Sequence, residues 1–265
     1  MKTVLTIAGF DPSSGAGVTA DLMVFAAHGL FGTSCITALT VQNTLGVIAT
    51  HPVASHTLTS TLDCLYSDLP PVGIKIGMLA TADIVSAVVA FLTRIRQQTP
   101  VLVVLDPVLK SSSRKDLLEP NAIRTMRYEL LPQVDWITPN VDELGPLLGP
   151  QFDRDTSLDT AGAQLQELAP KLTVVVTGGH LDPPNDVLFE PGSASQILPG
   201  KRIQTASTHG TGCAFSSALL SRLVLGDQPL QAAQAAKSYV VQAMLSATPL
   251  GAGHGPLNLR PSNRS

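Results

Sequence analysis

The residues best suited to chemistry lie in one short stretch, where a glycine-rich turn leads into an apolar segment. Residues 208–213 are Thr-His-Gly-Thr-Gly-Cys. Glycine lets the backbone point its N–H groups at a ligand, and the N-terminal end of a following helix attracts an anion. A thiol at such a helix start is easier to ionise. The pattern therefore predicts an anion site at Gly210, Thr211 and Gly212, with Cys213 as its nucleophile or base.

Two carboxylates occupy positions where they could hold Mg²⁺. Asp106 directly follows the apolar run 101–105, and Glu143 is the third residue of a predicted helix that starts after Asn140. Mg²⁺ binds a few carboxylates and keeps several of its waters. A simpler interpretation is equally open for each: Asp106 as a turn residue before Pro107, and Asn140 with Glu143 as a helix capping box.

The elements that would position these residues alternate between buried strands and helices. Short apolar runs predict strands at Val4–Ile7, Ile36–Thr40, Ile74–Ile76, Val101–Leu105, Trp136–Thr138 and Thr173–Thr177. Longer patterns predict helices at Ala20–His28, Ala82–Gln97, Asn121–Leu131, Asp142–Leu148, Thr160–Leu168, Ala214–Leu225 and Gln231–Ala247. This succession is typical of an α/β fold with a mostly parallel sheet, and Asp186–Phe189 with Gln196–Leu198 predict a small antiparallel hairpin at its edge.

The polar and glycine-rich segments follow the predicted strands, at the ends where open α/β sheets bind ligands. These segments are residues 9–17, 42–44, 106–108, 139–140 and 178–180. The first of them lacks both the lysine of a Walker A loop and the dinucleotide-binding glycine pattern. We therefore expect five strand ends to form one cleft that differs from the standard nucleotide-binding loops.

Composition restricts the class of protein. The chain has 265 residues, is 44% hydrophobic and has a formal net charge of −3, with no basic run. This charge favours neither a nucleic acid nor an anionic membrane as a partner. The three cysteines have neither a metal-ligand spacing nor the even count of a disulfide framework, so a reducing, cytoplasmic location fits best. Because no linker or internal repeat divides residues 1–265, we expect a single domain.

Several motifs, in order along nearly the whole chain, resemble those of the hydroxymethylpyrimidine/phosphomethylpyrimidine kinases of thiamine biosynthesis. The motifs are at residues 8–17, 37–44, 75–79, 138–143, 178–180, 208–213 and 253–257. The resemblance implies a ribokinase-like three-layer sandwich, ATP with Mg²⁺, and a homodimer. It also implies phosphorylation of 4-amino-5-hydroxymethyl-2-methylpyrimidine and then of its monophosphate.

The same resemblance implies roles for individual residues. Cys213 would accept the substrate hydroxyl proton, while Gly210, Thr211 and Gly212 would hold the transferring charge. Asp106 and Glu143 would manage Mg²⁺. Gly9, Asp21, Gln42, Met78 and Val108 would form the pyrimidine pocket. Thr177, Gly179, His209 and Asn140 would contact the nucleotide.

The chain also departs from the family pattern. Thr177 stands where a lysine is usual, so a cation is missing unless Lys110, Arg114 or Lys115 in the altered segment 110–116 replaces it. A pyridoxal kinase is the nearest alternative, because pyridoxal is also a flat heterocycle with a hydroxymethyl group. A non-catalytic pyrimidine-binding module is a second alternative, and a dehydrogenase is remoter because the dinucleotide-binding glycine pattern is absent.

Overall fold

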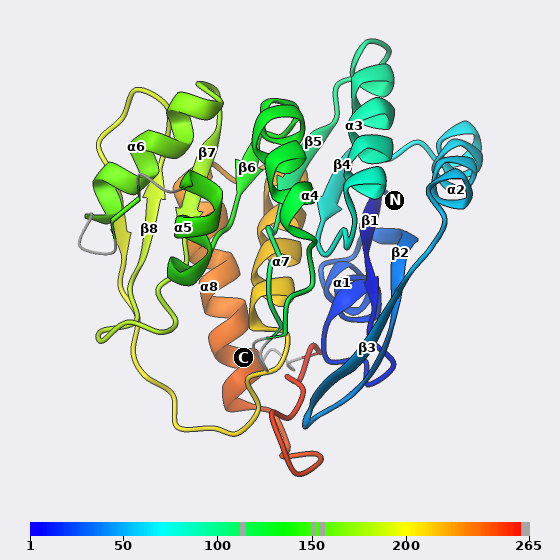
Figure 1. The fold of residues 1–265 in the computed structure, drawn as a ribbon. Coiled ribbons are helices and arrows are strands. Elements are labelled where there is room, and N and C mark those ends of the chain that lie inside the picture. Colours follow the sequence, from blue (N-terminus) through cyan, green and yellow to red (C-terminus); the bar gives the residue numbers. More distant parts are fainter. Residues whose placement is uncertain (112–114, 150–151, 154–156, 261–265) are drawn as a thin grey trace.

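The computed structural model describes residues 1–111, 115–149, 152–153 and 157–260. In this part of the chain, a nine-stranded sheet has the order β3-β2-β1-β4-β5-β6-β7-β8-β9 (Figure 1). Its strands are β1 (Thr3–Phe10), β2 (Phe31–Asn43), β3 (Gly46–Pro52), β4 (Gly73–Ile76), β5 (Leu102–Leu105), β6 (Trp136–Ile137), β7 (Thr173–Val176), β8 (Asp186–Phe189) and β9 (Gln196–Leu198). Strands β2, β1, β4, β5, β6 and β7 are parallel, whereas β3 pairs antiparallel at one edge and β8 and β9 do so at the other.

Helices cover both faces of the sheet. They are α1 (Gly17–Ala27), α2 (Ser55–Asp68), α3 (Ala82–Arg96), α4 (Pro120–Thr125), α5 (Val141–Leu148), α6 (Leu158–Leu168), α7 (Thr211–Leu225) and α8 (Pro229–Leu245). A π-helical turn, Met126–Leu130, and a 3₁₀ turn, Leu131–Gln133, continue α4. The three-layer α/β fold predicted from the sequence is therefore confirmed.

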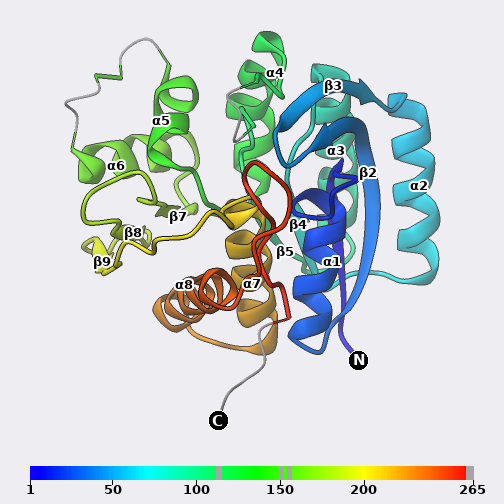
Figure 2. The ribbon, with the colours of Figure 1, turned by 90° about the horizontal axis from the view of Figure 1, so that it is seen from below.

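Side chains alternate along each strand, so the buried apolar residues form two clusters, one on each face of the sheet. Leu5, Ile74 and Ile76 pack in one buried cluster with side chains of α2 to α6. Val4 and Val104 pack in the other with α1, α7 and α8 (Figure 2). Successive residues of a strand point to opposite faces, so Thr6, Lys75 and Asp106 continue the second face, toward α1 and α7. This placement brings three polar residues beneath the start of α7.

The order of the strands also indicates the edge of the sheet at which a ligand would bind. From β1 the chain goes to β2 on one side and returns through β4 on the other, so the direction of the strand order reverses beside β1. Ligands of open α/β sheets bind at such a point, beyond the carboxyl ends of the strands. The loop after β1 and Asp106, which follows β5, meet the start of α7 there. None of the described helices has the length and apolarity needed to cross a membrane.

Candidate active site

Two glycine-rich loops interlock where α7 begins. Gly210 has φ +83° and precedes the first helical residue, a conformation that favours glycine. A Cβ on Gly210 would lie 1.8 Å from the Gly15 carbonyl oxygen, and one on Gly17 (φ +61°) would lie 2.2 Å from that of Gly9. Loop 9–17 and the turn before α7 therefore approach each other more closely than any side chain would allow. Thr211 and Gly212 form the first turn of α7, as the predicted anion site requires.

A histidine–aspartate pair joins the same two loops. His209 Nε2 lies 2.7 Å from Asp11 Oδ2, and both residues are largely buried. Asp11 also accepts hydrogen bonds from the backbone N–H groups of Ser13 and Ala16. Although burial opposes ionisation, the bonds from His209 and Ser13 lower the pKa of Asp11 to about 2. The nucleotide contact of His209 stays a prediction; in the structure its Nε2 is paired with Asp11 of loop 9–17.

Cys213 is in the first turn of α7 and is partly exposed. Its position predicted a thiol that ionises easily, but its surroundings oppose ionisation. Burial raises the pKa of Cys213 to about 12, and the negative charges of Asp21 and Asp106 raise it further. Lys75 and a hydrogen bond from the Gly17 backbone lower the pKa but do not offset burial. Cys213 is therefore a thiol at neutral pH before substrates bind.

Asp106 and Glu143 are buried close enough to each other to interact electrostatically. Ser216 of α7 donates to Asp106 Oδ2 at 3.2 Å, and burial raises the pKa of Asp106. Burial, with a smaller contribution from Asp106, raises the pKa of Glu143 to about 8. Two carboxyl groups that resist ionisation are well suited to share a divalent cation. No cluster of three or more metal-ligating side chains occurs among the described residues, so water would have to complete a Mg²⁺ site.

Glu143 also has the structural role that the sequence left open. Asn140 Oδ1 accepts from the Glu143 N–H at 3.1 Å, and Glu143 Oε2 accepts from the Asn140 N–H at 2.9 Å. This reciprocal pair is the predicted capping box of α5. Its second carboxylate oxygen, Oε1, lies 3.5 Å from the Leu109 N–H. The capping box fixes the direction of the carboxylate without preventing a role toward a cation.

Most residues predicted for the pyrimidine pocket are brought together. A Cβ on Gly9 would lie 2.9 Å from Met78 Sδ, so Gly9 and the Met78 side chain are in close contact. Met78 belongs to a small buried cluster with Ala38, Ala80 and Leu117, against which Val108 and Val47 pack. Gln42 pairs with Val47 across the β2–β3 hairpin. Met78, Gly9, Val108 and Gln42 therefore converge on one region.

Asp21 does not join that pocket. Its side chain is completely buried, and its carboxylate is occupied by Lys75, Thr6 and Ser217. The substrate-binding role predicted for Asp21 is therefore wrong, because no face of the carboxylate is left for a ligand. Lys75, its ion-pair partner, had no predicted role. The sequence signals for Lys75 are its place in the family motif at residues 75–79 and its charge within the otherwise apolar strand 73–76.

The loop after β7 lies next to the start of α5. The Thr177 N–H donates to the Pro139 carbonyl at 2.8 Å, and the Thr177 hydroxyl lies 3.4 Å from the same oxygen. Asn140 and Thr177 form an isolated parallel bridge, and Gly179 is exposed with open space around its Cα. The loop thus brings Thr177, Gly179 and Asn140 together, and Arg202 donates to its Gly179 and Leu181 carbonyls at 3.2 and 2.6 Å.

The predicted replacement cations are occupied elsewhere. Lys110 pairs with Asp116 at 3.4 Å within its own segment, and the Lys115 ammonium donates to the Ile48 carbonyl of β3. Arg114 lies outside the described residues. Neither described lysine therefore reaches the loop at Thr177 in this conformation.

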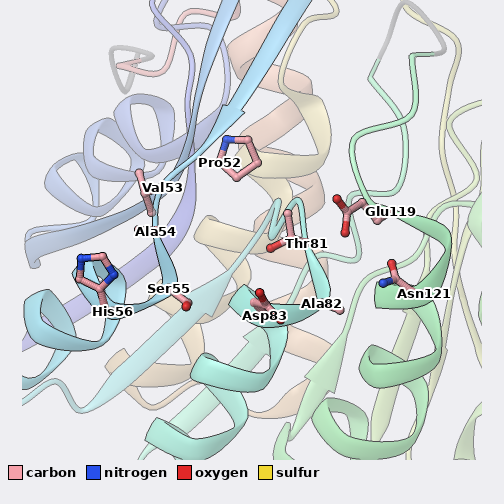
Figure 3. Close-up of a pocket in the computed structure, with 10 residues that line it drawn as sticks. All are labelled: Pro52, Val53, Ala54, Ser55, His56, Thr81, Ala82, Asp83, Glu119 and Asn121. Carbon is pink, nitrogen blue, oxygen red and sulfur yellow. The ribbon is translucent and has the colours of Figure 1, made fainter.

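A surface cavity of about 470 Å³ lies apart from these residues (Figure 3). It is lined by residues at the starts of α2, α3 and α4: Pro52, Val53, Ala54, Ser55, His56, Thr81, Ala82, Asp83, Glu119 and Asn121. None of the predicted site residues lines it. The predicted chemistry therefore belongs to the loop cluster and not to this cavity.

Residues 11–258 match the model of the phosphomethylpyrimidine kinase family. The chain belongs to this family. It is 39% identical to the hydroxymethylpyrimidine/phosphomethylpyrimidine kinase of Haemophilus influenzae over 97% of this chain and 96% of that protein. It is 41% identical to the Escherichia coli enzyme of the same name over 95% and 94% of the two chains. The predicted family and the predicted phosphotransferase class are confirmed.

Some relatives are longer. The chain is 38% identical to the thiamine biosynthesis bifunctional protein of Geobacter sulfurreducens and spans 52% of it. It spans 34% of a multifunctional relative from Corynebacterium efficiens. The similarity therefore concerns one part of those proteins, and it says nothing about their remaining activities.

Solved structures show the same fold with two kinds of named substrate. An ADP complex of Bacillus subtilis pyridoxal kinase matches with a TM-score of 0.88 at 29% identity, over 100% of both chains. A phosphomethylpyrimidine kinase from Clostridium difficile matches with a TM-score of 0.79 at 34% identity, over 92% of this chain and 99% of that one. A Staphylococcus aureus pyridoxal kinase, similar at a TM-score of 0.85 and 28% identity over 100% and 96% of the chains, was solved with AMP-PCP and pyridoxal.

Proposed function

We propose that the protein transfers the γ-phosphoryl group of ATP to the hydroxymethyl group of 4-amino-5-hydroxymethyl-2-methylpyrimidine, and then phosphorylates the resulting monophosphate. The observation that carries this proposal is the interlocked pair of glycine-rich loops at the start of α7, with Cys213 and Asp106 beside them. The names of the full-length relatives support the choice of substrate. Residues 1–265 would act as one cytoplasmic kinase domain.

The residues divide the chemistry between them. The substrate oxygen forms a bond to the γ-phosphorus as the bond from that phosphorus to the bridging oxygen of ADP breaks. Backbone N–H groups at Gly210, Thr211 and Gly212 stabilise the charge on the transferring group, since phosphoryl transfer depends mainly on alignment and electrostatic stabilisation. Cys213 is protonated in the protein alone, so its thiol first loses its proton to water when the substrates and the cation are in place, and the thiolate then accepts the proton of the substrate hydroxyl. Met78, Gly9, Val108 and Gln42 hold the heterocycle against β2.

Asp106 and Glu143 fit a hydrated Mg²⁺ ion, since their carboxylates are buried together and provide the hard oxygen ligands that this ion prefers. When bound, the ion would neutralise negative charge on the phosphates. The two carboxylates hold that position from β5 and α5. Thr177, Gly179 and Asn140 would face the nucleotide from the neighbouring loop, while His209 orders that edge of the site through Asp11.

A substrate panel tests the proposal. Purified protein with Mg-ATP is expected to convert the hydroxymethylpyrimidine and its monophosphate with kcat/KM values well above that for pyridoxal. Absence of turnover on both pyrimidines would contradict the proposal. Pyridoxal kinase is the second candidate, because the fold matches pyridoxal kinases of B. subtilis and S. aureus over the whole chain. A higher kcat/KM for pyridoxal would favour that candidate.

Thr177 provides a test of the non-catalytic alternative. A lysine at this position would add a charged hydrogen bond, which contributes about 1.5 to 3 kcal/mol against about 1 kcal/mol for a neutral one. Thr177→Lys is therefore expected to raise kcat/KM about threefold to tenfold, measured with varied ATP. Ligand binding by calorimetry without ADP formation, in both the wild type and the variant, would indicate a binding module.

We also propose a homodimer. The β2–β3 hairpin forms one edge of the sheet, and Leu39, Val41 and Ile48 on it are 48%, 47% and 70% exposed. An exposed apolar edge strand favours pairing with another chain. A second copy of the protein is the partner that the resemblance to the family implies.

A further inference from the structure

A completely buried lysine lies at the centre of the sheet, beneath the start of α7. Lys75 of β4 pairs in register with Thr6 of β1, and its neighbours Ile74 and Ile76 pack on the opposite face of the sheet. A Cβ on Gly77 would lie 2.9 Å from the Lys75 ammonium, so this glycine leaves space for the charge. Lysine is almost never fully buried unless it is paired. Lys75 therefore requires an explanation.

Its partner is Asp21, which joins four elements. Lys75 Nζ lies 3.0 Å from Asp21 Oδ1 and 2.9 Å from Oδ2, and both side chains are 0% exposed. Thr6 donates to Oδ2 at 2.6 Å and Ser217 to Oδ1 at 2.7 Å. Ser217 is one helical turn after Cys213. The ion pair thus links β1, β4 and α1 to the first turns of α7.

The charge of Lys75 acts on the first turn of α7, where Cys213 lies. Burial opposes its ionisation, but Asp21, Cys213 and Asp106 together raise the pKa of Lys75 well above its ordinary value. Asp106, held by Ser216 of α7, and Asp21 both place negative charge near Cys213. Lys75 supplies the opposing positive charge there. Without Lys75, the negative charges of Asp21 and Asp106 near Cys213 would lose this opposing positive charge and would repel the polyphosphate of the nucleotide.

We propose that Lys75 is a positioning residue for phosphoryl transfer: its buried ammonium, held in place by Asp21, acts more strongly at Cys213 than the Asp21 carboxylate does, and so keeps the start of α7 from becoming electronegative toward the transferring group. The inference rests on the proposed kinase function. It is consistent with the engagement of Lys110 by Asp116 and of Lys115 by the Ile48 carbonyl. Lys75 touches no substrate, because it has no exposed surface.

The test separates charge from packing. Lys75→Met leaves Asp21 as an unpaired buried carboxylate and is expected to be strongly destabilising. The double variant Asp21→Asn/Lys75→Met removes both charges at similar volume, which restores stability in many buried pairs. We expect its Tm to return to within a few degrees of wild type, while kcat stays at least about tenfold lower. KM for the pyrimidine should change less than about threefold, because the pocket residues are untouched.

Two further variants complete the comparison. Asp21→Asn alone keeps the ammonium group and is expected to have a higher kcat than the double variant. Arg96→Met/Asp135→Asn removes another ion pair, 2.6 Å long, between the end of α3 and the residue before β6. It should leave kcat at the wild-type value, since these residues lie at the amino ends of the strands.

The outcomes distinguish the inference from the function on which it rests. If the stable double variant has the wild-type kcat, or if Asp21→Asn and the double variant have equal kcat, Lys75 has only a packing role and the inference is overturned. If the double variant does not fold, the comparison of Asp21→Asn with wild type decides, because a large loss of kcat with the ammonium still present would overturn the inference. Wild-type protein without turnover would overturn the proposed function as well.

Discussion

At the level of single residues, Cys213 carries the most specific expectation. Cys213→Ala is expected to lower kcat by about 10² to 10⁴, the range for loss of a general base, while pyrimidine binding stays within several-fold. Steady-state kinetics and calorimetry measure the two effects. Cys64→Ala, on the exposed side of α2, is the matched control and should leave kcat unchanged. A Cys213→Ala enzyme with wild-type kcat would show that the thiol is not the base.

The buried carboxyl group of Glu143 is expected to lower the free energy of unfolding at high pH. Burial raises its pKa from 4.5 to about 8. Between these pH values the unfolded state ionises more readily than the folded state, so the free energy of unfolding falls as the pH rises from 4.5 to 8. Glu143→Gln should therefore raise Tm by several degrees at pH 8 and much less at pH 5, and should lower kcat at both. Thermal denaturation across this pH range gives the comparison, with the exposed Glu167→Gln as control. A variant less stable than wild type at pH 8 would refute this account.

Individual residues also show which parts of the candidate site could be predicted from the sequence. The sequence pattern indicated Cys213, Asp106 and Glu143, because each follows a strand or starts a helix at the edge where ligands bind. Met78 was assigned to the pocket only by the resemblance to the family. Lys75 was missed, because a lone lysine within an apolar run has no pattern that distinguishes burial from exposure. The pKa of Cys213 was misjudged for a related reason, since desolvation depends on what packs above the thiol, and only the folded structure shows this.

At the level of elements, Asp11 is expected to fasten loop 9–17 to the turn before α7. Its pKa falls from 3.8 to about 2, so it adds about 2 kcal/mol to the free energy of unfolding above pH 4, and this contribution is lost as the pH falls from 4 toward 2. Asp11→Asn should lose this amount at pH 7, and the difference from wild type should shrink by pH 3.

Urea denaturation at several pH values measures that difference. Asp142→Asn is the control, because Asp142 and its partner His180 are both strongly exposed and surface pairs of this kind contribute little. An equal loss of stability in the two variants, or a loss for Asp11→Asn that does not depend on pH, would contradict the role of Asp11.

Elements with strong patterns were predicted well, and weakly patterned ones were not. The buried strands β1, β4, β5 and β7 and the second hairpin at β8 and β9 lie where their apolar runs indicated. The segment Gly46–Pro52 was missed as a strand, because its side chains are mostly half-exposed and it pairs only at the edge. Helix α2 was missed because it is rich in serine and threonine and buries only Leu58 and Leu62.

At the level of the whole molecule, the exposed edge of the β2–β3 hairpin is expected to hold two copies together. Ile48→Lys places a charge on a side chain that is 70% exposed in one copy, so the fold should tolerate it, whereas burying that charge between two copies would be unfavourable. We expect sedimentation velocity to show a dimer for wild type and a monomer for Ile48→Lys at the same concentration, with nearly equal Tm values.

Ile197→Lys is the matched control, because Ile197 is 65% exposed on β9, the antiparallel strand at the opposite edge of the same sheet. It should remain dimeric. The hairpin also carries Gln42 and packs Val47 against the Met78 cluster, so separation of the copies should raise KM for the pyrimidine more than it lowers kcat. Loss of the dimer in Ile197→Lys but not in Ile48→Lys would place the contact between copies at the β9 edge of the sheet. A monomeric wild type would exclude the proposed dimer.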